Sequence, residues 1–141
     1  MSLDPQPLAP ALAAAEASGW TAVRMDLDGV RTKAELMRRV ADALRLPEWF
    51  GGNWDALADC LRDLSWLPVV AGRLVCVTSW REFAAARPAD WETFQEILEE
   101  AVDFWRAEED AAAFVVLLAE SGPGPVAGAP PRTPRLKRRR G

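Results

Sequence analysis

The sequence predicts a small α/β domain, in which a three-stranded parallel sheet packs against about four helices. The chain has 141 residues, of which 50% are hydrophobic and 27% charged, and this composition is typical of a single globular domain. Three short runs have the character of strands, and helical segments separate each run from the next. Parallel strands joined by right-handed crossovers are the usual arrangement for such an order.

The first half of the chain contains a lead, one strand and one helix. Residues 1–19 are rich in alanine and proline, and we expect a flexible lead or a short helix there. Apolar and polar residues alternate over 20–27, which predicts a strand. Thr32 and Glu35 have the spacing of a capping box, so a helix is expected to begin at Thr32 and to end before Pro47.

The second half contains two strands and the remaining helices. Asn53 is a good N-cap and predicts a helix that runs to about Leu64. The apolar stretch 73–78 predicts a strand that is buried on both faces. After a short helical segment, Asp90 is expected to cap a longer amphipathic helix. The apolar run 112–119 predicts the last strand.

The charges divide the chain into an acidic domain and a basic end. The formal net charge is −4, but residues 132–141 hold six of the 17 basic residues and no acidic one. Residues 1–131 therefore carry 11 basic and 21 acidic side chains. We expect a domain over 20–120 that attracts basic partners, followed by a disordered basic tail over 121–141. The tail is either a solubilising extension or a segment that contacts nucleic-acid phosphates.

The residue types that are absent exclude several function classes. The chain has no histidine, which excludes Ser-His-Asp and Cys-His nucleophiles and every metal site that contains histidine. Cys60 and Cys76 lack CxxC spacing, and we expect both to be buried and reduced. No signal peptide is visible and no apolar stretch approaches the ~20 residues of a membrane span, so we expect a cytoplasmic protein. We expect neither a metal nor a cofactor.

The second predicted helix carries three aspartates four residues apart, Asp55, Asp59 and Asp63. Like charges at this spacing share one helix face and repel one another. The face is either simply solvated or functional. Catalysis by paired carboxylates is one functional interpretation, although the face has no evident cleft that would raise a pKa. A binding face is another, because Gly51 and Gly52 allow a close backbone approach and two aromatic residues precede them.

The chain resembles the barstar family, the intracellular inhibitors of small secreted ribonucleases, in the segment 46–61, which is Leu-Pro-Glu-Trp-Phe-Gly-Gly-Asn-Trp-Asp-Ala-Leu-Ala-Asp-Cys-Leu. The family pattern is Leu-Pro-Glu, two aromatic residues, Gly, any residue, Asn, a large apolar residue, Asp-Ala-Leu and then Asp-Cys-Leu. The resemblance extends over about residues 21–119, since the order of strands and helices matches the family's three-stranded parallel sheet. It leaves out the lead and the tail.

In that family, the second helix and the loop before it plug the active-site cleft of a ribonuclease. The resemblance therefore implies six partner-binding residues, Trp49, Gly51, Asn53, Asp55, Asp59 and Glu100. It further implies that the Asp59 carboxylate takes the place of a substrate phosphate. Two positions depart from the family, since Gly52 stands where an acidic residue is found and Ala58 replaces a large aromatic residue.

The resemblance and the acidic face favour a non-enzymatic inhibitor, which occludes the basic cleft of a ribonuclease or related nuclease toxin in an immunity or antitoxin role. Two alternatives stay open. The first is an interaction module of the same fold whose partner is not a nuclease. The second is a nucleic-acid-associated protein that acts through the basic tail. An enzyme is the class that the residues favour least.

Overall fold

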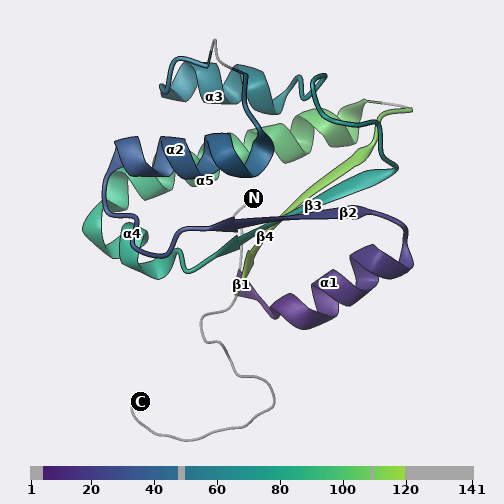
Figure 1. Ribbon diagram of the computed structural model, residues 1–141, viewed down its shortest axis with the longest axis horizontal. Coiled ribbons are helices and arrows are strands. Elements are labelled where there is room, and N and C mark those ends of the chain that lie inside the picture. Colours follow the sequence, from purple (N-terminus) through teal and green to yellow (C-terminus); the bar gives the residue numbers. More distant parts are fainter. Residues whose placement is uncertain (1–4, 48–49, 109, 120–141) are drawn as a thin grey trace, which may run out of the picture.

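A computed structural model describes residues 5–47, 50–108 and 110–119. It contains one parallel sheet in the order β1-β4-β3-β2, with helices on both faces (Figure 1). The strands are β1 (Pro5–Gln6), β2 (Thr21–Asp26), β3 (Gly72–Thr78) and β4 (Ala113–Ala119). The helices are α1 (Leu8–Ala17), α2 (Lys33–Leu44), α3 (Trp54–Leu61), α4 (Arg81–Ala86) and α5 (Pro88–Ala107).

This architecture confirms the predicted α/β class and adds one strand and one helix to it. Both additional elements, β1 and α1, lie in residues 1–19, where a short helix was one of two expectations. β1 pairs only two residues with the end of β4, so it is too short to produce an alternating pattern. α1 is rich in alanine and buries only Ala15, which leaves little helical periodicity for the sequence to show.

The two faces of the sheet are covered unequally (Figure 1). On one face, α2, α4 and α5 enclose the main hydrophobic core, whereas α1 is the helix of the described residues that packs on the other face. β3 is buried on both faces, because Val75 faces the main core while Leu74 and Cys76 face α1. Val75 pairs in register with Val23 of β2 and Val116 of β4. α3 lies outside this helical layer and packs against α5.

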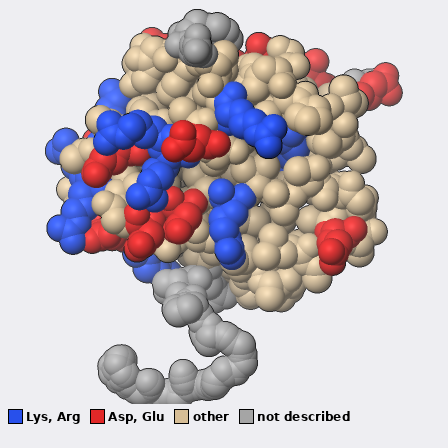
Figure 2. Space-filling model, in the orientation of Figure 1, with Lys and Arg blue, Asp and Glu red and all other residues tan. Residues whose placement is uncertain are grey.

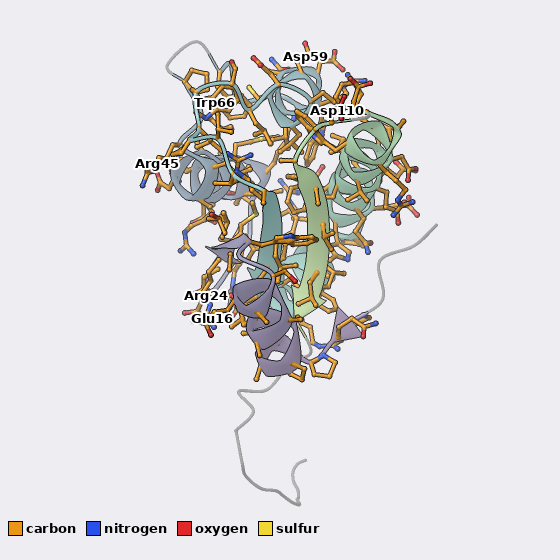
Figure 3. The ribbon with its side chains drawn as sticks, turned by 90° about the vertical axis from the view of Figure 1, so that its right-hand side faces the viewer. Glu16, Arg24, Arg45, Asp59, Trp66 and Asp110 are labelled. Carbon is orange, nitrogen blue, oxygen red and sulfur yellow. The ribbon has the colours of Figure 1, made fainter. Side chains whose placement is uncertain are left out.

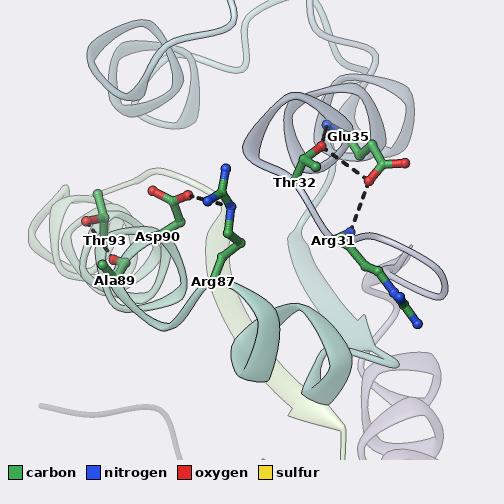
Figure 4. Close-up of polar contacts among 7 residues, drawn as sticks. All are labelled: Arg31, Thr32, Glu35, Arg87, Ala89, Asp90 and Thr93. Atoms are coloured by element: carbon green, nitrogen blue, oxygen red, sulfur yellow. Dashed lines mark hydrogen bonds and ion pairs between the residues drawn. The ribbon is translucent and has the colours of Figure 1, made fainter.

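The predicted capping box is present at the start of α2 (Figure 4). Thr32 Oγ1 accepts the backbone N–H of Glu35 at 3.2 Å, and Glu35 Oε1 accepts the backbone N–H of Arg31 at 3.1 Å. The bond from Arg31, with further bonds from Thr32, favours the ionised carboxylate and lowers the pKa of Glu35. The local sequence therefore determines where α2 begins.

The start of α5 differs from the prediction. The helix begins at Pro88, after Arg87, so the prediction that Asp90 caps it is wrong. Proline suits the first helical position because it lacks the N–H that would have no partner there. Asp90 lies inside the first turn, with its Oδ2 3.8 Å from Arg87 Nε (Figure 4).

Candidate functional site

The residues before α3 turn the chain directly into the helix. Asn53 Oδ1 accepts the backbone N–H of Ala56 at 2.8 Å, which confirms Asn53 as the N-cap. Gly52 has a φ of +71°, a backbone conformation that favours glycine. Gly51 has little room for a side chain, because a Cβ there would lie 3.2 Å from Asn53 Nδ2. The exposed backbone of both glycines is therefore accessible to a partner.

The inner side of α3 fixes it to the rest of the domain. Leu57 and Leu61 are fully buried in the main core. At the C-terminal end, Trp105 Nε1 on α5 donates a hydrogen bond to the Leu61 carbonyl at 2.7 Å. At the other end, Lys33 Nζ on α2 lies 5.2 Å from the centre of the Trp54 ring. Both ends of α3 thus contact neighbouring helices, and its outer side stays exposed.

The outer side of α3 carries two of the predicted binding residues, Asp55 and Asp59. Both are exposed, and the Asp59 side chain retains 75% of its accessible surface. Figure 3 shows Asp59 on the side of α3 that points away from the sheet. Carboxylates in this position are suited to contact a partner's cations, whereas acid–base catalysis is favoured by a desolvated cleft.

The third predicted aspartate lies elsewhere. α3 ends at Leu61, before the expected end near Leu64, so Asp63 lies outside the helix. Asp63 Oδ1 accepts the backbone N–H of Ser65 at 3.3 Å in the turn that follows. Leu64 has a φ of +56°, which is incompatible with a continuing helix. The prediction that Asp63 shares the face of Asp55 and Asp59 is therefore wrong.

Arg62 takes that position on the face. It is the C-cap of α3, its Nη2 lies 3.4 Å from Asp59 Oδ1, and its Nε donates to the Ala58 carbonyl at 3.3 Å. Asp55, Asp59 and Arg62 follow the spacing i, i+4, i+7, so one exposed face carries acid, acid and base in sequence. The interpretation of the sequence missed Arg62, although the same spacing would have identified it.

The other residues near the expected contact site differ in the element on which they lie and in their exposure. Glu100 is exposed on α5, the helix against which α3 packs. Ala58 is half-buried and packs against the main core, so its outward contribution is small. Trp49 lies outside the described residues, whereas its neighbour Phe50 packs against the main core. The structure therefore places Gly51 and Asn53 directly before α3, Asp55 and Asp59 on α3, and Glu100 on α5, against which α3 packs.

The negative charge is concentrated on α5 rather than on α2. Figure 2 shows Lys and Arg side chains over α2, interleaved with Asp and Glu. The solvent-accessible acidic side chains of α5 beyond its first turn are Glu92, Glu96, Glu99, Glu100 and Asp103. A basic partner would therefore meet a more negative surface on α5 than on α2.

The chemistry of the remaining polar groups is limited. Cys60 and Cys76 are buried and free, and burial raises the pKa of both thiols. Within residues 5–47, 50–108 and 110–119, no group of three or more His, Cys, Asp or Glu residues could hold a metal ion. In the same part of the chain, no helix has the length and apolar character to cross a membrane.

The fold and the site define a small parallel α/β domain in which α3 lies on the outer layer with an exposed acidic face. A family model described as Barstar (barnase inhibitor) matches residues 20–119, and the chain belongs to this family. Members of the family are inhibitors and not enzymes. A search of curated proteins gave no match to the chain. The matched segment begins after β1 and α1, so these two elements lie outside it.

Proposed function

We propose that the chain binds and occludes the basic active-site cleft of a ribonuclease, or of a related nuclease toxin, through α3 and the loop before it. In this role it would act in the cytoplasm as an immunity protein or antitoxin. Family membership supports a nuclease inhibitor. The observation that carries the site is the Asp59 carboxylate, which is 75% exposed on a helix held at both ends.

The energetics of α3 favour a role in binding. Asp55 and Asp59 lie four positions apart, and like charges at this spacing destabilise a helix by ~0.2–0.5 kcal/mol. A cationic cleft would neutralise both carboxylates and remove this repulsion. A nuclease must also hold a phosphodiester with cations, so its cleft offers the complementary charge. The two carboxylates therefore repel each other in the free protein and are attracted to the cations of the cleft in the complex.

The individual residues would have different roles. Asp59 would mimic the substrate phosphate, and Asp55 would contact cations at the rim of the cleft. Gly51 would allow close backbone approach, because its exposed backbone has no side chain in front of it. Glu100 would add an acidic contact from α5. Trp49 would supply the aromatic anchor that such interfaces commonly use.

The test is a titration of the purified protein into a fluorogenic RNA-cleavage assay with a panel of small bacterial ribonucleases. We expect stoichiometric inhibition of at least one of them. Asp59→Ala should weaken inhibition by about 2–5 kcal/mol. This range comes in part from the barnase–barstar complex, so it is not independent of the family to which the chain belongs. Asp55→Ala and Glu100→Ala should weaken it less.

The matched control is Asp90→Ala. Asp90 also forms an i, i+3 ion pair with an arginine, Arg87, but it lies at the start of α5, at the end of that helix opposite to Trp105. Asp90→Ala should leave inhibition unchanged. Binding to a non-nuclease partner that survives neutralisation of Asp55 and Asp59 would instead favour an interaction module of the same fold.

A further inference from the structure

Arg62 places a cation directly beside the carboxylate that the proposed function assigns to phosphate mimicry. Its side chain is 45% exposed, and its Nη2 lies 3.4 Å from Asp59 Oδ1. Its Nε bond to the Ala58 carbonyl at 3.3 Å holds the guanidinium against the end of α3, where the helix dipole favours a cation. The group is therefore held on the same surface that the partner would cover.

This guanidinium is only partly satisfied by the protein itself. A guanidinium has five N–H donors, and two of them donate to Ala58 and Asp59. The other three have no acceptor among the described residues, and the side chain is 45% exposed. A partner that covers Asp59 would remove water from these donors as well. Burying them without an acceptor is unfavourable, so a tightly bound partner must supply one.

We infer that Arg62 is a specificity-determining residue, which selects partners whose cleft presents a carboxylate beside the cations that hold the phosphate. This inference rests on the proposed function and refines its partner class. The surface then presents the Asp59 carboxylate beside the Arg62 guanidinium. A complementary cleft places a cation opposite Asp59 and a carboxylate opposite Arg62. A planar guanidinium binds a carboxylate through two parallel hydrogen bonds, which makes the selection geometric as well as electrostatic.

The chemistry of RNA cleavage explains why a cleft would contain such a carboxylate. A general base must take a proton from the attacking hydroxyl, and it must lie within hydrogen-bond reach of the group beside the phosphate. Only a few side chains perform this task, mainly histidine, glutamate and aspartate. Arg62 would pair with a glutamate or aspartate base and would be repelled by a histidine in its cationic form. The predicted partner is thus a ribonuclease with a carboxylate general base.

A competing role for Arg62 predicts that its removal changes the binding affinity in the opposite direction. If Arg62 only competed with the partner's cations for Asp59, its removal would strengthen binding. If it pairs with a carboxylate of the cleft, its removal weakens binding. The direction of change in one substitution therefore distinguishes the two roles.

The experiment measures inhibition of a small bacterial ribonuclease with a carboxylate general base by wild-type protein, Arg62→Ala and Arg62→Lys. We expect Arg62→Ala to weaken inhibition about 10- to 100-fold, the range of one lost charge-assisted contact. Arg62→Lys should restore only part of the lost inhibition, since lysine keeps the positive charge but lacks the planar pair of N–H donors. Arg87→Ala, which breaks an exposed i, i+3 pair at the start of α5, should change inhibition less than about twofold.

A calorimetric double-mutant cycle completes the test. The ribonuclease variant with its general base changed to the amide should bind wild-type protein about 10- to 100-fold more weakly, and Arg62→Ala should add no further loss. Unchanged or tighter binding by Arg62→Ala, with Asp59→Ala still defective, would overturn the role of Arg62 alone. Inhibition that survives Asp59→Ala, or no inhibition by the wild-type protein, would overturn the proposed function and this inference together.

Discussion

Asn53 combines two roles that mutation can separate, the N-cap of α3 and a proposed partner contact. Its Oδ1 accepts the Ala56 N–H at 2.8 Å, and the residue is exposed. Thr32 is the N-cap of α2 and makes the equivalent bond to the Glu35 N–H at 3.2 Å. The two caps therefore allow a comparison between one on the proposed binding surface and one away from it.

The expected loss of stability follows from this geometry. Replacing a capping side chain by alanine generally costs about 0.5–2 kcal/mol. Because Asn53 is exposed, water can reach the freed Ala56 N–H, and this places Asn53→Ala near ~1 kcal/mol rather than at the upper limit. For a chain of this length, such a loss lowers the Tm by ~3–6 °C. Thr32→Ala should lower it by a similar amount.

The assay pairs urea and thermal denaturation with the ribonuclease inhibition titration. Both variants should lose stability equally, but only Asn53→Ala should also weaken inhibition, because it loosens the first turn that carries Asp55. Asn53→Asp retains a capping oxygen and should restore stability. Equal inhibition constants for Asn53→Ala and wild-type protein would refute the reasoning, as would a stability loss above ~3 kcal/mol, since no single exposed cap accounts for it.

Three further predictions concern the rest of the domain. Gly72→Ala should destabilise it by about 1–3 kcal/mol in urea denaturation, because the new Cβ would lie 2.6 Å from ring atoms of Trp20. The pKa of Glu35 is lowered on folding, so its contribution to stability is complete above its usual pKa of about 4.3 and is lost as the pH falls through the lower folded value. Glu35→Gln should therefore flatten the dependence of unfolding free energy on pH below about 4.3. Cys60 and Cys76 should react with iodoacetamide at pH 8 about tenfold or more slowly in the folded protein than in urea, because burial raises the pKa of both thiols; equal rates would contradict their burial.

Short sequence patterns are sufficient to predict much of this structure. The alternating run at β2 and the continuous apolar runs at β3 and β4 each correspond to a strand within a residue or two. The caps at Thr32 and Asn53 act within three residues of sequence, so a local pattern is sufficient to find them. The segment 46–61 is equally local, and it contains most of the proposed binding residues.

The features that were missed depend on contacts between distant parts of the chain. The end of α3 is held by the bond from Trp105 to the Leu61 carbonyl, across 44 residues, which no local spacing encodes. The aspartate spacing alone therefore predicts a longer helix with Asp63 on its outer face. Arg62, which occupies that face, is the one missed feature that the same local spacing identifies. β1 also depends on a distant strand, since its two residues pair with the end of β4.

The cover that α1 provides on the second face of the sheet separates two properties of the protein. Leu74, Cys76 and Leu117 lie beneath α1, and all three fall within the segment that the family model matches, whereas α1 does not. A shortened chain that begins at residue 20 would retain every residue of the proposed binding surface. It would, however, expose an apolar sheet face and the full outer edge of β4, the geometry through which strands of different molecules associate. If α3 binds the target as proposed, removal of the N-terminal segment would promote association between copies of the protein and would leave affinity for the target unchanged.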